Sequence, residues 1–388
     1  MVKRFHINNQ QSVLFGVFRR RWPHIARCMV VLFGLLVFPK LGVTQESTPQ
    51  QVPQEEAASE VNEQESQKGA EDVPAVDEMT PELNSAVELG IAYLKKEQLP
   101  DGSFGEGKYR QHVGITSLAA LAIMADGNLP GRGPHGEAVQ KALNFILSNV
   151  TETGLIAADK TSHGPMYGHG FATLFLGEIY GMNPTDTRVR DALVKAVNLI
   201  VGTQNSEGGW RYNPVPFDAD VSVTICQVMA LRSARNAGIK VPKKTIDQAV
   251  DYVKNCHNPD GGFKYMLNSG SSAWPRTAAG VATLFYAGLY EDAAITKGLE
   301  YLNKKVLPNI KTSGQPHYYY GQYYAVQAMY LAGGDQWKRW WPEVREALVR
   351  NQSSSGGWLD HHAGGSYATA MSLIILQMPK RYLPIFQR

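Results

Sequence analysis

The chain has 388 residues, enough for one large domain or two of average size, and its 38 basic and 35 acidic residues give a formal net charge of +3. The charge is unevenly distributed: residues 1–44 hold seven basic and no acidic residues, and residues 45–80 hold ten acidic residues and one lysine. The remainder carries only a mild basic excess and no cluster of lysine or arginine, which excludes nucleic acid as a partner.

The first predicted element is an N-terminal export signal. Basic residues precede an apolar run from Cys28 to Phe38, and small residues follow at positions 42–44. The run is shorter than the roughly 20 residues that a membrane-spanning helix needs, which favours a signal peptide. A retained N-terminal membrane anchor is the alternative interpretation of residues 1–44. Both interpretations predict an exported or periplasmic protein. A retained anchor would in addition tether the protein to the membrane.

Residues 45–80 are predicted to be a disordered acidic linker, because they contain almost no large apolar side chains with which to form a core. The packed domain is therefore expected over residues 81–388. Cys226 and Cys256 lie in that domain, in helical segments and outside any C-x-x-C pattern. They are expected to be buried free thiols rather than parts of a disulfide framework or a metal site.

A sequence repeat divides this domain into units of about 50 residues. Each copy has a glutamine, or histidine in one case, then three residues, a glycine, one further residue and a large apolar residue. One copy, which begins at Val150, is degenerate, and the spacing leaves room for another near Ser313 and Gly314, so six units are expected. The large apolar positions of the recognisable copies are Phe104, Ile156, Trp210, Phe263 and Trp358.

Each unit is predicted to be a helical hairpin. Its first segment has apolar residues at helical spacing on one face and ends at the glycine of the repeat, which can adopt the positive φ that terminates a helix. Its second segment is apolar on most sides, as a buried helix is. Six such hairpins predict an all-α fold, an α6–α6 toroid with an inner and an outer ring. The inner helices are expected to begin near Val113, Gly170, Val221, Ala279, Gly321 and Gly365.

The pattern Q-x3-G-x-W/F resembles the QW repeat of squalene-hopene cyclases and of the wider terpenoid cyclase and protein prenyltransferase superfamily. The resemblance covers residues 81–388. It implies an α6–α6 toroid whose active-site residues lie at the mouth of the inner ring, near the N-termini of the inner helices. The repeat itself is predicted to be structural, because its glutamine can bind exposed backbone groups at a helix end and its aromatic ring can pack between hairpins.

Asp218 and Asp220 are the candidate catalytic residues. Residues 217–222 resemble the D-x-D-D-T/S motif of class II terpene cyclases, in which the middle aspartate protonates a polyprene. Asp220 matches that aspartate, whereas Val221 replaces the third one. Two neighbouring carboxylates would raise the pKa of one of them, as a proton donor requires. The alternative is that Asp220 only caps the helix that follows it, which is a common role of aspartate.

Other polar and aromatic residues precede the predicted inner helices and are expected to face the same mouth. Their aromatic rings could stabilise a carbocation by cation–π attraction, although each residue taken alone is more often a cap or a packing residue. The candidate substrate-binding residues are His112, Tyr167, His169, Trp274, Arg276, His317, Tyr320, Tyr323, His362 and Tyr367.

Neither a metal nor a cofactor is expected. Protein prenyltransferases hold zinc with Asp, Cys and His, but Ser222 stands where the cysteine would follow Asp220. The position of the histidine ligand in the last repeat is occupied by the sequence Tyr367-Ala368-Thr369. Two of the three ligands are therefore missing from the pattern.

Three tryptophans, Trp337, Trp340 and Trp341, flank Lys338 and Arg339 at the start of the last predicted outer helix. Tryptophan beside basic residues suits the headgroup region of a bilayer, so one hypothesis is a membrane-surface patch. The other hypothesis is a hydrophobic staple that packs the start of this helix.

Three functions remain open from the sequence. The first is a squalene or terpenoid cyclase-like protein that handles an isoprenoid or similar apolar ligand, by acid-initiated cyclisation if it is an enzyme. The second is a non-catalytic toroid that binds a protein or peptide in its central cavity, and the third is a carbohydrate-active (α/α)6 enzyme. Squalene cyclases carry a second helical domain over the substrate and this chain has one toroid, so a protein partner that covers the mouth is also expected.

Overall fold

The computed structural model describes residues 78–158, 163–307 and 315–387. The chain divides into two units, residues 1–63 and residues 64–388, and every described residue belongs to the second unit. The expected signal or anchor, residues 45–77 of the expected linker, and the repeat copy expected near Ser313 and Gly314 therefore lie outside the described residues.

The described part of the chain forms twelve α-helices and no β-strand, which confirms the all-α prediction. The even-numbered helices are α2 (Val113–Met124), α4 (Met166–Met182), α6 (Val221–Asn236), α8 (Trp274–Tyr286), α10 (Tyr318–Ala332) and α12 (Gly365–Leu376). The odd-numbered helices are α1 (Pro81–Glu97), α3 (Gly136–Ser148), α5 (Thr187–Gly202), α7 (Lys243–Asn255), α9 (Ala293–Lys305) and α11 (Gly334–Arg350). Short 3-10 helices include η1 (Gly107–Tyr109), η3 (Met378–Lys380) and η4 (Pro384–Phe386).

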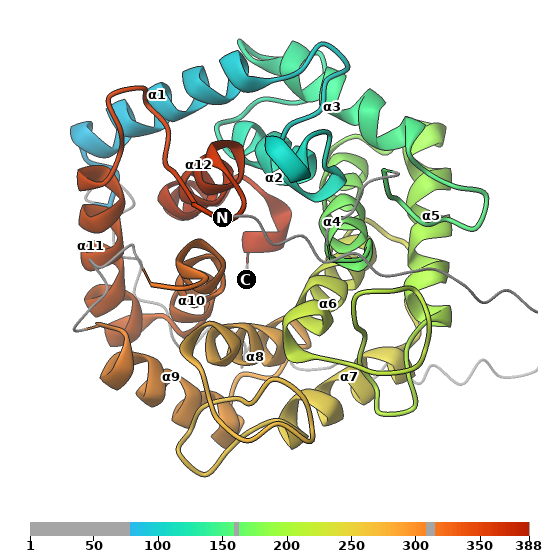
Figure 1. The fold of residues 1–388 in the computed structure, drawn as a ribbon, viewed down its shortest axis with the longest axis vertical. Helices are drawn as coiled ribbons and strands as arrows, with labels where there is room; N and C mark the ends of the chain where they lie inside the picture. The colour runs from blue at the N-terminus through green and yellow to red at the C-terminus, as the bar shows by residue number, and fades with distance from the viewer. Residues whose placement is uncertain (1–77, 159–162, 308–314, 388) are drawn as a thin grey trace, which may run out of the picture. The chain divides into compact units, whose positions relative to one another are not determined.

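The even-numbered helices form an inner ring, and the odd-numbered helices form an outer ring around it (Figure 1). Each inner helix packs against the next one, and α12 packs against α2, so the inner ring is closed. The predicted α6–α6 toroid is therefore confirmed. Three inner helices begin at the predicted residue, namely α2, α6 and α12, and the other three begin three to five residues earlier than predicted.

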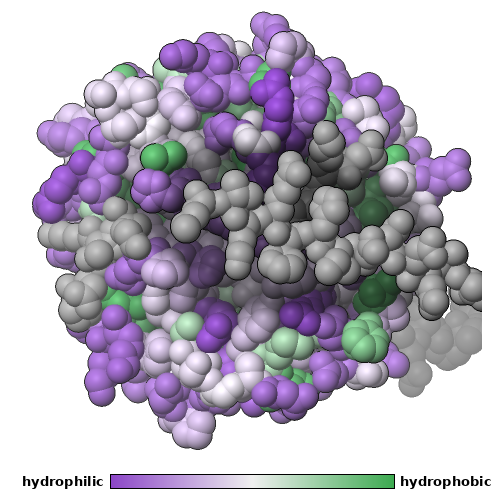
Figure 2. Space-filling model, in the orientation of Figure 1, coloured by the Kyte–Doolittle hydropathy of each residue, from purple (hydrophilic) through white to green (hydrophobic). Residues whose placement is uncertain are grey.

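The residue types decide which ring a helix joins. Every residue of α2 is buried, and apart from Thr116 and Ser117 its side chains are apolar. A helix of this kind is stable only where neighbours cover all of its faces. In contrast, α7 buries one face, including Ala249, Tyr252 and Val253, and exposes lysines and aspartates on the other. The periphery of the domain is accordingly hydrophilic for the most part (Figure 2).

In three copies of the repeat, at Gln98, Gln204 and Gln352, the glutamine joins its outer helix to the next one. The Nε2 of Gln204 donates hydrogen bonds of 2.8 Å to the glycine carbonyl of its own repeat and to the carbonyl of Thr245 in the first turn of α7. Gln352 makes the same two bonds, the second of them at 2.8 Å to the carbonyl of Ala86 in α1. The last outer helix is thus fastened to the first, which closes the outer ring.

The Gly-Gly-Trp segment is structural, as predicted. The buried indole of Trp210 donates to the carbonyl of Ile200 at 2.8 Å and so covers the end of α5. Gly208 adopts a φ of +98°, and a Cβ atom at this position would lie 2.2 Å from the carbonyl oxygen of Gln248. Only glycine allows both the backbone conformation and this close approach of α7.

A threonine in the first turns of an inner helix binds the aromatic residue of the repeat. The Oγ1 of Thr224 accepts the N–H of Trp210 at 3.2 Å. The degenerate copy uses His169 instead, whose Nδ1 accepts the N–H of Ile156 at 3.1 Å, and burial lowers the pKa of His169 to about 4. The structure therefore places this candidate residue in a buried structural bond and not at the mouth. The other threonines in this role are Thr116, Thr277 and Thr369.

The tryptophans of α11 pack the seam between the last and first repeats. Trp337 donates a hydrogen bond to the buried carboxylate of Glu78 and stacks on Trp341 with 4.9 Å between ring centroids. The exposed fractions of Trp337, Trp340 and Trp341 are 6%, 0% and 3%. The membrane-surface patch is therefore a wrong prediction, because the rings cannot reach a bilayer. Within the described residues, no helix is long and apolar enough to cross a membrane.

Candidate active site

Asp220 is positioned by the repeat and by the helix that it precedes. Its backbone N–H donates to the carbonyl of Trp210 at 3.0 Å, so the Gly-Gly-Trp loop fixes the chain just before α6. Its Oδ1 accepts the N–H of Val223 at 2.9 Å, which makes Asp220 the N-cap of α6. Capping, one of the two roles considered for this residue, is therefore confirmed, and the second carboxylate oxygen remains available for other partners.

The second oxygen of Asp220 lies in a buried polar cluster. The hydroxyl of Tyr265 donates to Oδ2 at 3.2 Å, and the Nε of Arg211 lies 3.7 Å from the same atom. Burial of the side chain, which is 0% exposed, raises the pKa of Asp220 to about 6. The hydrogen bonds from Val223 and Tyr265 and the charge of Arg211 oppose this rise. Asp220 is consequently a carboxylic acid at mildly acidic pH.

Asp218 and Asp220 are linked by Arg211, which lies close to both carboxyl groups. The Nη1 of Arg211 forms an ion pair with Oδ2 of Asp218, and both side chains are partly exposed. The expectation that a second carboxylate raises the pKa of the proton donor is not met, because burial is the main cause of the rise at Asp220. Asp218 instead orients Arg211, whose guanidinium also lies 5.0 Å from the ring centroid of Tyr212.

Aromatic residues of α10 pack against the first turns of α6. The hydroxyl of Tyr320 donates to the carbonyl of Ser222 at 3.0 Å. Its ring contacts that of Tyr324 edge-on at 4.8 Å, and the hydroxyl of Tyr324 lies 3.2 Å from the Sγ of Cys226. Cys226 and Cys256 are both buried free thiols, as predicted.

Tyrosine hydroxyls near Asp220 remain protonated. Burial, followed by the electrostatic effect of neighbours that include Asp220, raises the pKa of Tyr167 and of Tyr320. The ring of Tyr167 also lies 6.1 Å from that of Tyr212, which connects α4 to the loop before α6. Asp220 therefore lies near neutral aromatic side chains from the inner helices α4 and α10 and from the loop before α8.

A second cluster joins the loops that precede α12, α2 and α4. The hydroxyl of Tyr109 lies 3.0 Å from Nε2 of His362 and 3.4 Å from Nδ1 of His163. The two imidazole rings are 5.8 Å apart, and the ring of His163 is 6.4 Å from that of Tyr212. This cluster therefore reaches the surroundings of Asp220. His362 was among the expected residues, whereas Tyr109 and His163 were not.

Two of the expected residues have structural contacts. The Nδ1 of His112 accepts the N–H groups of Gly114 and Ile115 at 3.1 and 3.3 Å and caps α2. Burial lowers the pKa of His112 to about 4, so the ring is a neutral acceptor. Trp274 lies against Gly321, where a Cβ atom would be 2.1 Å from the indole. It therefore sets the contact between α8 and α10.

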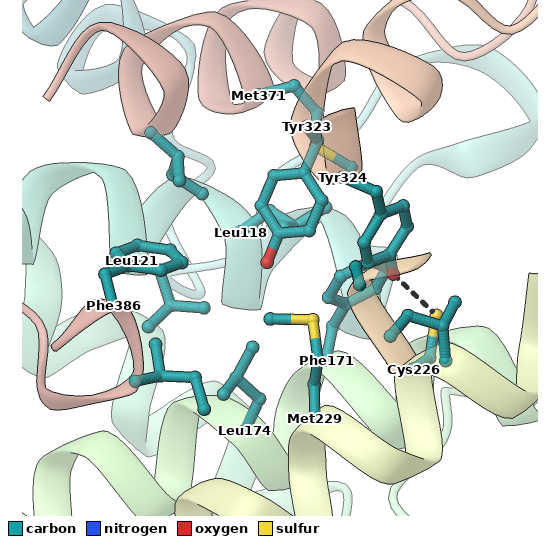
Figure 3. Packing of buried hydrophobic residues seen from close by; sticks show 14 of the residues in the cluster. Leu118, Leu121, Phe171, Leu174, Cys226, Met229, Tyr323, Tyr324, Met371 and Phe386 are labelled. Atoms are coloured by element: carbon teal, nitrogen blue, oxygen red, sulfur yellow. Dashed lines mark hydrogen bonds between the residues drawn. The ribbon is translucent and has the colours of Figure 1, made fainter. Parts of the chain in front are cut away.

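The remaining expected residues occupy different environments. Arg276 lies with its guanidinium 5.8 Å from the ring of Tyr265 and donates to a loop carbonyl at 2.9 Å. His317 is exposed just before α10, and Tyr367 is partly buried in the first turn of α12. Tyr323 points into the inner ring (Figure 3), and its buried hydroxyl has no hydrogen-bond partner within the described residues.

The sequence contains a signal for residues that were missed. Tyr212 and Tyr265 each follow the aromatic residue of their repeat by two positions. The same position holds Glu106 and Asp360 in other repeats, and Glu106 accepts the N–H and hydroxyl of Ser366 at 2.9 and 2.6 Å. The loop after each Gly-x-aromatic segment thus brings this position to the N-terminal end of an inner helix. Arg211 lies one position earlier and could have been found with it.

A family model described as the prenyltransferase alpha-alpha toroid domain matches the chain over residues 74–241 and again over residues 137–317. Together the two matches span more than half of the sequence. The chain belongs to the prenyltransferase alpha-alpha toroid family. Its sequence matches no curated protein. In the part of this toroid that the structure describes, no group of three or more His, Cys, Asp or Glu residues could hold a metal ion.

Several solved structures share the toroid. The type II terpene cyclase MstE from Scytonema is 14% identical, with 79% of this chain and 100% of that chain covered and a TM-score of 0.56. A variant of MstE in complex with geranylgeranyl dihydroxybenzoate has a TM-score of 0.54 at 14% identity, with coverages of 78% and 98%. An inactive variant of an alpha-1,6-mannanase from Salegentibacter, in complex with alpha-1,6-mannotriose, has a TM-score of 0.55 at 9% identity, with coverages of 76% and 98%. Likeness at these identities shows the fold alone.

The prenyltransferase toroid described here spans the whole solved chain of MstE. A solved type II terpene cyclase therefore consists of one toroid of this size. The expectation of a protein partner over the mouth of this toroid stays a prediction.

Replacing Tyr265 with phenylalanine should raise the pKa of Asp220 further, since the hydroxyl donates to its charged form and favours that form. We expect a rise of up to about one unit. Carbon-13 NMR titration of the Asp220 carboxyl group in the wild type and in Tyr265→Phe measures this rise. Tyr382→Phe is the control, because Tyr382 is exposed and lies in the C-terminal segment. An unchanged pKa in the Tyr265 variant would show that this hydrogen bond does not form.

Proposed function

We propose that this toroid is a class II terpene cyclase-like isomerase that cyclises an isoprenoid or similar apolar chain, with Asp220 as the proton donor. The observation that carries the proposal is a fully buried carboxyl group at the N-terminus of an inner helix, whose pKa burial raises to about 6. Such a group keeps its proton at mildly acidic pH, whereas an ordinary aspartate ionises above about pH 4.

The proposed reaction is an isomerisation. Asp220 gives its proton to one carbon of a terminal C=C bond, which forms a C–H bond and leaves a positive charge on the adjacent carbon. A second C=C bond of the same chain attacks that carbon and forms a ring C–C bond. Loss of a proton from a neighbouring carbon to water restores a C=C bond, and water returns a proton to Asp220. Product and substrate have the same composition, and the reaction needs no cofactor.

The surroundings of Asp220 suit this chemistry. Arg211, 3.7 Å away, and the hydroxyl of Tyr265 stabilise the carboxylate that remains after proton transfer. The rings of Tyr167 and Tyr320 come from the inner helices α4 and α10, and aromatic faces attract a carbocation. Donor, counter-charge and cation-stabilising surfaces therefore lie together.

The interior of the inner ring suits an apolar chain. Leu118, Leu174, Met229 and Met371 extend toward one another from α2, α4, α6 and α12 (Figure 3). All four residues are buried. An environment of this composition binds hydrocarbon in preference to water, because transfer of apolar surface out of water is favourable.

Glycoside hydrolysis requires two carboxyl groups on opposite sides of the bond, roughly 5–10 Å apart. Asp218 forms an ion pair with Arg211. Asp360 accepts the N–H groups of His362 and Ala363 at 2.8 Å and so stabilises its own loop. These contacts favour cyclisation over hydrolysis for this toroid.

Incubation of the protein with squalene and with shorter polyprenols, at acidic and neutral pH, tests the proposal. We expect a product of unchanged mass with a new retention time in gas chromatography–mass spectrometry. Conversion of none of these chains, together with no binding of any, contradicts the proposal. Release of sugar from an alpha-mannoside would replace it with the carbohydrate-active function, and a peptide that co-purifies with the toroid would replace it with a binding function.

A further inference from the structure

The last part of the chain returns to the inner ring at the end away from the candidate active site. After α12 it forms η3 and then η4, which packs against α4 and α6 near the C-terminal ends of these helices (Figure 1). Leu383, Ile385 and Phe386 are all buried there. We call residues 378–387 the C-terminal segment.

Glu178 of α4 holds the C-terminal segment by a hydrogen bond to its backbone. Its Oε2 accepts the N–H of Ile385 at 3.0 Å, and its Oε1 lies 2.7 Å from the Oγ of Ser233 in α6. Gly177 lets α6 come this close, since a Cβ atom there would lie 2.3 Å from the same Oγ. The side chain of Glu178 is 1% exposed, and a buried carboxyl group is unfavourable unless it is well hydrogen-bonded. One buried carboxyl group thus joins three parts of the chain.

Ser233 can partner either form of this carboxyl group. Its hydroxyl can donate to an ionised Glu178, or it can accept from a protonated Glu178 and donate to the carbonyl oxygen of Leu174 at 3.3 Å. Both forms therefore have a partner for each oxygen, and burial decides between them. Burial raises the pKa of Glu178 from its ordinary value of 4.5 to about 7, and the hydrogen bonds from Ser233 and Ile385 to the ionised form oppose this rise. Below about pH 7 the C-terminal segment consequently packs against a neutral carboxyl group.

The charged and titratable groups around Glu178 keep one charge state between pH 5 and 8. Tyr286 of α8 and Tyr323 of α10 face Glu178, and burial raises the pKa values of both, so their phenols stay neutral. Arg232 of α6, whose Nη1 lies 3.5 Å from the carbonyl oxygen of Tyr286, stays positive. Residues 383–387 contain no titratable side chain. Titration of Glu178 therefore changes the contacts of residues 383–387 in this range.

We propose that Glu178 is a proton-controlled latch on the C-terminal segment, which detaches from the inner ring more often when this carboxyl group is ionised. Detachment exposes Glu178 to water and uncovers apolar side chains such as Leu121 and Leu174, which lie near Phe386 (Figure 3). Burial of the apolar side chains of residues 383–386 keeps the closed form dominant at every pH, and the proton sets how often it opens. The latch is independent of the proposed cyclisation, because it lies at the other end of the ring from Asp220.

Opening of the latch should follow the titration of Glu178. In the open form the carboxyl group is in water and its pKa returns toward 4.5, whereas the closed form keeps the proton up to about pH 7. The ratio of open to closed molecules is therefore constant below pH 4.5. It rises by up to about tenfold per pH unit between pH 4.5 and 7, and it is constant again above this range.

Hydrogen exchange of the full chain, measured by mass spectrometry from pH 5 to pH 8, tests the latch. The quantity compared is the protection factor of a peptide that covers residues 383–387, corrected for the exchange rate of an unstructured peptide at the same pH. In the wild type we expect this factor to fall by at least about tenfold between pH 5 and 7 and then to stay constant. Glu178→Gln cannot ionise and should give a factor that does not depend on pH. Glu137→Gln, which changes an exposed glutamate of the outer helix α3, should behave as the wild type does.

The outcomes decide whether Glu178 is the group that controls the segment. A protection factor that does not depend on pH in the wild type overturns the latch, and so does an equal dependence in the wild type and in Glu178→Gln. If Glu178→Gln gives no cooperative thermal transition, carbon-13 NMR titration of the Glu178 carboxyl group in the wild type takes its place. A pKa near 7, at the pH where the protection factor becomes constant, supports the latch. A pKa near 4.5 overturns it.

Discussion

Replacing Asp220 with asparagine is expected to lower the turnover of an isoprenoid substrate by at least about 100-fold, the lower end of what general acid catalysis contributes. Asparagine has no acidic proton to give to carbon. The Tm of Asp220→Asn should nevertheless stay close to that of the wild type. Asparagine caps helices as well as aspartate does, and its Oδ1 can still accept the N–H of Val223. Product analysis and thermal melting of the same preparation measure both effects.

Two further variants separate the role of Asp220 as a proton donor from its role as a helix cap. Asp220→Ala removes both, so we expect lost turnover together with a loss of about 0.5–2 kcal/mol of unfolding free energy. Asp218→Asn releases Arg211 from its ion pair, which strengthens its interaction with Asp220 and lowers the pKa of Asp220. Turnover should then decline at a lower pH than in the wild type. Wild-type turnover by Asp220→Asn would show that Asp220 is only a cap.

Removing residues 334–388 is expected to abolish the cooperative thermal transition of the domain. This deletion takes away α11, α12 and the C-terminal segment, and so opens both rings. Burial of a single large apolar side chain such as Trp340 or Trp358 stabilises the fold by roughly 1.5–3 kcal/mol. The repeat buries many such side chains, and the total stability of a domain is only about 5–15 kcal/mol. Circular dichroism melting and resistance to proteolysis are the measurements.

The matched variant Gln352→Ala keeps the repeat and removes only its bonds to Ala86 and to its own glycine loop. We expect it to remain folded with a loss of about 1–3 kcal/mol, since each bond contributes about 0.5–1.5 kcal/mol. An open array of repeats would lose its last unit and stay folded. A deleted chain that still melts cooperatively near the wild-type Tm would therefore contradict the closed ring.

The toroid could be predicted because local signals determine it. The glutamine, glycine and aromatic residue that end at Trp210 recur at a constant spacing, and Gln204 and Gln352 make the same pair of hydrogen bonds in the structure. The inner helices could be found since they are rich in small and apolar residues on most sides, as in α2. Errors of a few residues at α4, α8 and α10 arose where an aromatic residue lies in the first turn of the helix.

The candidate site could be predicted only in part, because its contacts join distant positions. Asp220 was found from a local motif, but its partner Tyr265 lies 45 residues further along the chain. Arg211 is close in sequence, and yet its pairing with Asp218 depends on the path of the loop before α6. The bond between Glu178 and Ile385 spans 207 residues, and no local pattern predicts it.

Turnover in D2O distinguishes proton donation to carbon from simple binding of the chain. The carboxyl proton of Asp220 exchanges with solvent, and the proton lost at the end of the reaction comes from a carbon of the substrate. We therefore expect the wild type to give a cyclised product one mass unit heavier, with a single deuterium on the carbon that is protonated first, and Asp220→Asn to give no labelled product. A cyclised product without deuterium, or equal labelling by the two proteins, would contradict Asp220 as the acid.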